Sequence, residues 1–294
     1  MQAFADLEAG LERRRQRVEA VLLEVMPEQA SAVGRAAAYS LSAPGKRLRP
    51  VLSLLVTEML RAEPETVLPA ACAIELVHTA SLILDDLPSM DDARTRRGRA
   101  ACHLVHGEAT AILAAFALLN RAFEILSSGW PGAPPPVLRQ TIAGDLAAAV
   151  GLSGMIAGQA ADLEMTGRPL DFSTLEFIHS RKTGALFIAA AALGAVAANA
   201  DEAARSAVCA YAKNLGLAFQ IVDDLLDVTG DPAVAGKDLQ QDVKKTTFVS
   251  FAGTEGARQI AAELADTSIR SLVGFGAGAE PLRELARDVA ARRR

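Results

Sequence analysis

SLILDDLPSMDD, residues 81–92, places four carboxylates directly after an apolar helical pattern and includes no basic residue. Neighbouring like charges repel, and Pro88 interrupts the helix that could have spaced them apart. On an uninterrupted helix Asp85 and Asp91 would lie on different faces, but a break at Pro88 allows both to turn toward one point. The stretch therefore predicts a positively charged partner.

A second stretch, FQIVDDLLDVTGD at residues 219–231, repeats the pattern of an apolar helical run that ends in an Asp pair. Its helical spacing places Asp223 above Asp227, with Asp224 beside them. Each acidic stretch alone is also compatible with a solvated helix end. The apolar residues before each pair favour acids that emerge from a buried helix, where uncompensated charge is costly.

Outside these stretches, the composition indicates helices nearly throughout. The chain has 294 residues, of which 51% are hydrophobic and only 4% aromatic, and strand-like alternation is rare. We expect an all-α protein with one domain over residues 1–294 and no internal repeat. Pro and Gly positions predict helices at about 5–26, 28–41, 46–61, 66–86, 92–103, 107–128, 135–164, 172–180, 183–199, 202–229, 239–252, 255–273 and 280–292.

Several classes of protein are disfavoured by charge and composition. The net charge of −5 provides no basic field for nucleic acid. Three distant cysteines without metal-ligand spacing, and a charged N-terminus without a signal-peptide core, favour a cytoplasmic location. The longest uncharged run, residues 183–200, is rich in alanine and predicts a buried helix, so no integral membrane segment is expected.

Basic residues recur at four places, each with few acidic neighbours. These are GKRLRP at 45–50, RTRRGR at 94–99, RKT at 181–183 and KKTT at 244–247. Each alone is typical of a solvated basic face, but arginine forks and lysine ammonium groups are also the usual ligands of phosphate. Magnesium prefers one or two carboxylates together with phosphate oxygens and water. Two acidic stretches and four basic ones therefore predict a site for a diphosphate bridged by Mg²⁺.

Seven motifs in order, spread over nearly the whole chain, resemble the trans-isoprenyl diphosphate synthases. They are GKRLRP, ELVHTASLILDDLPSMDD, RRG, GQAADLE, KTG, GLAFQIVDDLLD and GK…KKTT. The match is most similar to bacterial and plastid geranylgeranyl diphosphate synthases. The resemblance implies a bundle of long antiparallel helices around a central cavity, a homodimer, and condensation of isopentenyl diphosphate with allylic diphosphates.

The resemblance also implies the roles of particular residues. About three Mg²⁺ ions would be bound by the two acidic motifs, at Asp85, Asp86, Asp91, Asp223, Asp224 and Asp227. The allylic diphosphate would be bound by Arg96, Lys182, Thr183, Gln220, Lys237 and Lys245. Isopentenyl diphosphate would be bound by Lys46, Arg49, His78 and Arg97, although a histidine in an apolar helix is also typical of a satisfied core residue. The catalytic set would be Asp85, Asp91, Arg96, Lys182 and Asp223.

Product length is expected to depend on the residues one helical turn before the first aspartate. Family members with aromatic rings there make shorter products, whereas this chain has the small Ala80 and Ser81. We therefore expect the C20 product, geranylgeranyl diphosphate, with the C15 product, farnesyl diphosphate, as the alternative. Phe116 stands where many family members have the Asp of a Gly-Asp pair, and it is either a wall of the product pocket or ordinary core packing.

Two other functions remain as alternatives. A terpene cyclase would share the fold, but its second metal motif typically contains Asn, Ser and Glu, whereas this chain reads DDLLD at residues 223–227. A catalytically silent subunit that alters a partner synthase would typically lack one acidic motif, and both are intact here. The sequence therefore favours an active synthase.

Overall fold

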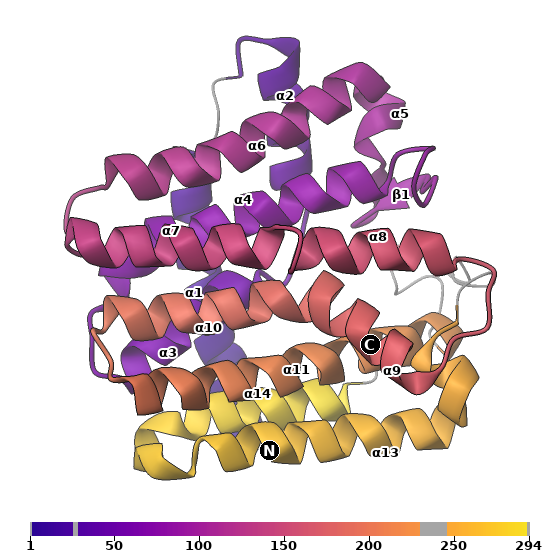
Figure 1. Ribbon diagram of the computed structural model, residues 1–294. Helices are drawn as coiled ribbons and strands as arrows, with labels where there is room; N and C mark the ends of the chain where they lie inside the picture. Colours follow the sequence, from indigo (N-terminus) through magenta and orange to yellow (C-terminus); the bar gives the residue numbers. More distant parts are fainter. Residues whose placement is uncertain (1, 26–28, 230–245, 293–294) are drawn as a thin grey trace.

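The computed structural model describes residues 2–25, 29–229 and 246–292, without the side chains of residues 2–6 and 229. In this part of the chain nearly all regular structure is helical (Figure 1). The α-helices are α1 (Gln2–Val25), α2 (Ala32–Leu41), α3 (Leu48–Met59), α4 (Leu68–Asp85), α5 (Cys102–His106), α6 (Glu108–Ser128), α7 (Pro136–Val150), α8 (Met155–Met165), α9 (Phe172–His179), α10 (Ala185–Ala197), α11 (Glu202–Thr229), α13 (Phe248–Ser271) and α14 (Glu280–Ala291). The shorter elements are η1 (Pro64–Val67), η2 (Ser180–Gly184), η4 (Val273–Ala279), and the strands β1 (Thr95–Arg96) and β2 (Arg99–Ala100).

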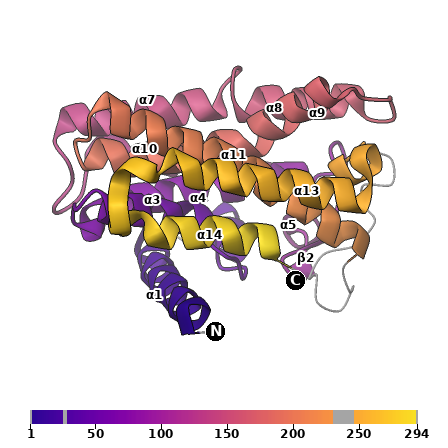
Figure 2. The same ribbon diagram turned by 90° about the horizontal axis from the view of Figure 1, so that it is seen from below.

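Two apolar helices, α4 and α10, form the centre of the bundle. Helix α4 packs against α1, α3 and α6, and α10 packs against α3, α7 and α11, which in turn packs against α13. The many alanines of α10 lose little side-chain entropy on burial and allow its neighbours to approach closely. Both α4 and α11 end on the side of the bundle where β1 lies, at the right of Figure 1. The two acidic motifs are thereby brought to the same side of the bundle. Helices α13 and α14 cover the bundle from below, as Figure 2 shows. The expected all-α fold is confirmed.

The helix expected at 92–103 is wrong for residues 92–101, and α5 begins only at Cys102. Residues 95–100 form an antiparallel hairpin that pairs Thr95 with Ala100 and Arg96 with Arg99. The two-residue turn consists of Arg97 and Gly98, whose φ angles of 54° and 75° both lie in the left-handed region. Turns of this type match the twist of a hairpin and require positive φ at both positions. The turn chemistry therefore overrides the helical pattern.

Two further differences concern helix boundaries. The single helix expected at 135–164 is split into α7 and α8 at residues 151–154, where Gly154 has a non-helical backbone. A side chain at Gly154 would lie 2.1 Å from the carbonyl oxygen of Ala149, so only glycine fits this bend. Half of the helix expected at 239–252, residues 239–245, lies outside the described residues, and in the described half the helix begins only at Phe248, the first residue of α13.

Three described segments are long and apolar enough to cross a membrane, judged by length and composition alone. They are Pro64–Asp85, Glu108–Ser128 and Pro136–Met165. The first is mostly buried within the protein, whereas less than half of the apolar window in each of the other two is buried. The expected absence of a membrane segment therefore stays a prediction.

Candidate active site

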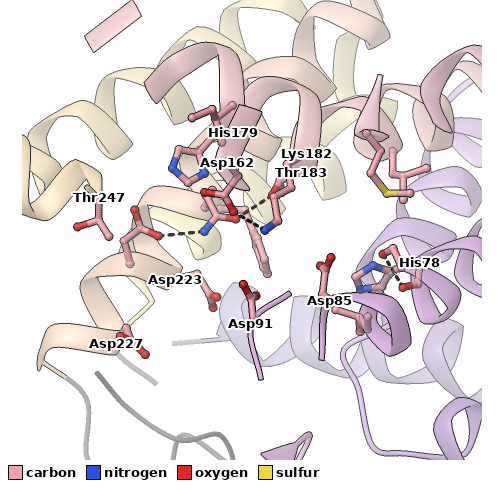
Figure 3. A pocket seen from close by; sticks show the side chains of 18 of the residues that line it. His78, Asp85, Asp91, Asp162, His179, Lys182, Thr183, Asp223, Asp227 and Thr247 are labelled. Carbon is pink, nitrogen blue, oxygen red and sulfur yellow. Dashed lines mark hydrogen bonds and ion pairs between the residues drawn. The ribbon is translucent and has the colours of Figure 1, made fainter. Parts of the chain in front are cut away.

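A cavity of about 430 Å³ lies where α4 and α11 end, and residues of both acidic motifs line it (Figure 3). It is lined by most of the residues predicted from sequence: Lys46, Arg49, His78, Ser81, Asp85, Asp91, Arg96, Arg97, Lys182, Thr183, Gln220, Asp223, Asp224 and Asp227. They come from segments that are as much as 181 positions apart in the chain, from Lys46 to Asp227. Folding therefore assembles the predicted anionic and cationic groups around one space.

The first acidic motif reaches the cavity through a tight turn after α4. Asp85 is the last residue of the helix, and the backbone N–H of Asp91 donates to the carbonyl oxygen of Asp85 at 2.9 Å. The chain thus folds back at Pro88, as the sequence predicted, and both carboxylates line the cavity. Burial raises the pKa of Asp85 to about 6; Lys182 opposes this shift, while the negative charge of Asp91 adds to it. The burial of Asp85 and the negative charge of Asp91 beside it favour the binding of a cation near both carboxylates.

The second acidic motif lies on α11, and its three carboxylates have unequal roles. Asp224 is almost fully buried and accepts hydrogen bonds from Gln220 Nε2 at 2.9 Å and from the backbone N–H of Phe248 at 3.3 Å. It therefore ties α11 to the start of α13. Asp223 is half-buried in the cavity wall, and Asp227 is buried there one helical turn further on. Figure 3 shows both carboxylates on the side of the cavity opposite His78.

Lys182 and Thr183 are presented by η2, a single turn of π-helix. π-Turns of this kind are frequent at functional sites. Lys182 Nζ lies 2.7 Å from Asp162 Oδ2 on α8, and Thr183 Oγ1 donates to Gln220 Oε1 at 2.8 Å. The close approach of α8 depends on Gly158, because a Cβ there would lie 2.2 Å from the backbone nitrogen of Lys182. Asp162 was not predicted as a site residue, although the GQAADLE motif contains it.

The structure places Asp86 outside the cavity lining. Its role as a metal ligand stays a prediction. Asp86 is 2% exposed and accepts a hydrogen bond from Arg96 Nε at 2.9 Å. Burial raises the pKa of Asp86, while the hydrogen bond from Arg96 opposes that shift. Because Asp86 caps α4 after its last turn, its side chain turns toward the hairpin, while that of Asp85 lines the cavity. Asp86 therefore positions Arg96, which does line the cavity.

The cavity also has a basic wall, which is formed by the start of α3 with the residues just before it, the middle of α4 and the hairpin turn. It contains Lys46, Arg49, His78 and Arg97, the four residues predicted for isopentenyl diphosphate. The guanidinium of Arg49 lies 4.7 Å from the ring centre of Phe187, a cation–π contact that orients it. Burial lowers the pKa of His78 well below its usual value, and the positive charges of Arg49 and Arg97 lower it further. His78 is therefore a neutral imidazole that can form hydrogen bonds without adding charge.

Comparison with known proteins identifies the family. The sequence model described as polyprenyl synthetase matches residues 30–267. The chain belongs to the polyprenyl synthetase family. It is 40% identical to geranylgeranyl pyrophosphate synthase 12, chloroplastic, of Arabidopsis thaliana, over 98% of this chain and 82% of that protein. It is 41% identical to farnesyl diphosphate synthase of Geobacillus stearothermophilus, over 87% of this chain and 88% of that protein. Among solved structures, an FPP/GFPP synthase from Zymomonas mobilis has a TM-score of 0.87 and 35% identity, covering 98% of this chain and 99% of that chain.

The residues expected to set product length in this polyprenyl synthetase lie in three different environments. Ser81 lines the cavity and donates its hydroxyl to the carbonyl oxygen of His78 at 2.9 Å. Ala80 is buried in the core beside it. Phe116 is 61% exposed, so it neither closes the cavity from within the chain nor packs in the core. The reason is helical phase: α6 buries its other face, which includes Ala115 and Leu118.

Sequence reasoning missed several residues that line the cavity of this polyprenyl synthetase, namely Arg47, Glu75, Asp162, His179, Thr247 and Arg292. Four of them stand inside motifs quoted above: Arg47 in GKRLRP, Glu75 at the start of ELVHTASLILDD, Asp162 in GQAADLE, and Thr247 at the end of KKTT. His179 and Arg292 carried no local signal. Lys237 and Lys245, predicted for the allylic diphosphate, lie outside the described residues.

The carboxylates of the cavity fit a magnesium ion that brings its own further ligands. Among the described residues no group of three His, Cys, Asp or Glu side chains is close enough to hold a metal by itself. Magnesium is usually bound by one or two carboxylates together with substrate phosphates and water. Asp85 and Asp91 on one side, with Asp223 and Asp227 on the other, provide such incomplete sets in the polyprenyl synthetase cavity.

Proposed function

We propose that this protein is a magnesium-dependent prenyltransferase that condenses isopentenyl diphosphate with allylic diphosphates to make geranylgeranyl diphosphate. The observation that carries the proposal is the single cavity in which two acidic motifs face a basic wall. Membership of the polyprenyl synthetase family and the similarity to geranylgeranyl and farnesyl diphosphate synthases support the reaction class.

The cavity has two regions that suit two diphosphates. Lys46, Arg49 and Arg97 would bind isopentenyl diphosphate, while the neutral His78 would accept or donate one hydrogen bond to it. Arg96 and Lys182 would bind the allylic diphosphate between the two acidic motifs. About three Mg²⁺ ions bound to Asp85, Asp91, Asp223 and Asp227 would neutralise the departing pyrophosphate.

The chemistry requires charge stabilisation and alignment rather than a protein nucleophile. The carbon–oxygen bond of the allylic diphosphate breaks, and the double bond of isopentenyl diphosphate attacks the resulting allylic cation. A proton is then lost from the condensed product to the released pyrophosphate. Arg96 and Lys182 stabilise the charge that develops on the leaving group, and their carboxylate partners Asp86 and Asp162 hold them in place.

The proposed C20 product rests on the small Ser81 in the cavity wall. A serine leaves space beside the growing chain where a phenyl ring would block it. Product analysis by mass spectrometry tests the proposal: purified protein is incubated with Mg²⁺, isopentenyl diphosphate and, separately, C5, C10 and C15 allylic diphosphates. A dominant C20 product is expected. A dominant C15 product would keep the reaction but overturn the length, and no product would favour a silent partner subunit.

We also propose a homodimer that covers the outer face of α6. This face exposes Leu113 and Phe116, which are 54% and 61% exposed, and water-exposed apolar side chains in one row are typical of an interface. Light scattering on the wild type should give the mass of a dimer, and Leu113→Glu should yield monomer. Val273→Glu, at an exposed apolar residue of η4, is the matched control. The cytoplasmic location stays a prediction.

A further inference from the structure

Glu75 is a buried carboxylate in the middle of the basic wall. It lies on α4, one turn before His78, and is 1% exposed. A buried carboxylate is costly unless it is paired with positive charge and hydrogen-bonded. None of the metal or phosphate roles proposed above uses this residue, so its presence requires another explanation.

The contacts of Glu75 join two separate segments of the chain. Its Oε1 accepts from Arg47 Nη1 at 2.7 Å and from Arg97 Nη2 at 3.3 Å. Arg47 immediately precedes α3, and Arg97 lies in the turn between β1 and β2. Arg47 also donates from Nη2 to the carbonyl oxygens of Leu41 and Ala43, at 2.7 and 2.9 Å. One carboxylate oxygen therefore fixes the positions of both segments.

Both arginines have a left-handed backbone conformation, which glycine adopts readily and most other residues, arginine included, adopt rarely. The φ angle is 48° at Arg47 and 54° at Arg97. Such conformations persist only where surrounding contacts hold them, and they concentrate at functional sites. The two bonds to Glu75 are contacts of this kind. They hold the segments that carry Lys46, Arg49 and Arg97 against the cavity.

The two arginines differ in what remains available to a ligand. Arg47 is 4% exposed, and both of its Nη atoms donate to protein oxygens. Within the described residues only its Nε, which lies 3.8 Å from Glu19 Oε1, has no hydrogen-bond partner. Arg97 is half-buried in the cavity wall, and within the described residues its Nη1 has no hydrogen-bond partner. Glu75 thus holds one end of the Arg97 guanidinium and leaves a buried donor for an anion.

We infer that Glu75 is a positioning residue for isopentenyl diphosphate, acting through Arg97 and through Arg47 on the start of α3. The inference rests on the proposed function, since it assigns the basic wall to this substrate. The change in affinity for isopentenyl diphosphate that it predicts on removal of Glu75 is opposite in sign to the change that simple electrostatics predicts. Removing a negative charge beside a diphosphate should tighten binding if charge alone matters, whereas loss of positioning should weaken it.

Two substitutions separate charge from geometry. Glu75→Gln keeps the shape of the side chain but removes its charge, and Glu75→Asp keeps the charge but shortens the reach. The matched control is Asp145→Asn, which breaks the ion pair of Asp145 with Arg205, at 2.7 Å, outside the cavity lining. Steady-state kinetics give KM for each substrate and kcat, and thermal unfolding monitors the fold.

Both Glu75 variants should raise KM for isopentenyl diphosphate by about tenfold or more, with KM for the allylic diphosphate changed less than about threefold. The control should leave both KM values unchanged. A lower KM for isopentenyl diphosphate in Glu75→Gln would overturn the inference, and so would an equal rise in both KM values. Loss of the folded state in both Glu75 variants, or a lower Tm with unchanged KM values, would assign Glu75 a structural role only.

A binding experiment separates this inference from the proposed function. Calorimetric titration with inorganic pyrophosphate, in the absence of divalent cations, requires no turnover. Positioning predicts weaker pyrophosphate binding in Glu75→Gln than in the wild type, and equal or tighter binding would contradict it. If the wild type forms no prenyl product, the proposed function fails, but this comparison still decides the role of Glu75.

Discussion

The backbone N–H of Asp91 donates to the carbonyl oxygen of Asp85 at 2.9 Å, closing the turn that contains Pro88. This bond explains how two carboxylates six positions apart in the sequence line the same cavity. Asp86 and Asp92, which directly follow Asp85 and Asp91 in the sequence, are absent from the cavity lining. Of the four aspartates in this stretch, the turn therefore places two in the cavity lining and two outside it.

Replacing the carboxylates that face the cavity should abolish turnover while leaving the fold intact. Asp85→Asn and Asp223→Asn should each lower kcat by about 1,000-fold or more, because both would bind the metal that neutralises the leaving group. Asp92→Asn is the matched control, since Asp92 is exposed and does not line the cavity. Near-normal rates in Asp85→Asn or Asp223→Asn would refute the metal-binding role of that residue.

Asp86→Asn should affect the substrate rather than the metal. Because Asp86 holds Arg96 and does not line the cavity, its loss should raise KM for the allylic diphosphate by about tenfold. The Mg²⁺ concentration required for half-maximal rate should stay near the wild-type value. The opposite result, a higher Mg²⁺ requirement with unchanged KM, would confirm Asp86 as a metal ligand.

Much of this site was predictable because its chemistry is carried by local motifs. The acidic motifs, GKRLRP and KTG each show their residue types within a short window, and the helical period indicates which positions share a face. The direction in which the Asp86 side chain points was not predictable, since it depends on a tertiary contact with Arg96 of the hairpin. The exposure of Phe116 depends on which face of α6 packs against α4, which an alanine-rich helix does not specify. Glu75 was missed because a lone acid in an apolar helix reveals no partner.

Gly158→Ala should damage the site through packing. The added methyl group would lie 2.2 Å from the backbone nitrogen of Lys182, so α8 and η2 must separate, at a cost of about 1–3 kcal/mol. Both Tm and kcat should fall, since Lys182 moves with η2. Gly144→Ala is the control: it lies within α7, with nothing within 4 Å of the added Cβ, and should stabilise the protein by about 0.5–1 kcal/mol. A Gly158→Ala enzyme with wild-type Tm and kcat would contradict the close packing.

Ser81→Phe should shorten the product. A phenyl ring at this position would project into the cavity that Ser81 lines, and the growing chain would meet it after fewer condensations. Product analysis should show a shift from C20 toward C15, with the rate of the first condensation changed little. Ser81→Ala, which adds no volume, should keep the wild-type product. An unchanged product in Ser81→Phe would place the length-determining wall elsewhere.

Lys46 should give the reaction an alkaline limit. Partial burial lowers its pKa to about 8, and the positive charge of Arg292 adds to this shift, while Asp223 and Asp288 oppose it. The ammonium form is therefore present below about pH 8 in the free enzyme and is lost as the pH rises through that value. Since kcat/KM reports the free enzyme, kcat/KM for isopentenyl diphosphate should fall above about pH 8. Lys46→Arg should move this limit upward by more than one pH unit, because arginine stays charged. An identical pH profile in Lys46→Arg would show that another group sets the limit.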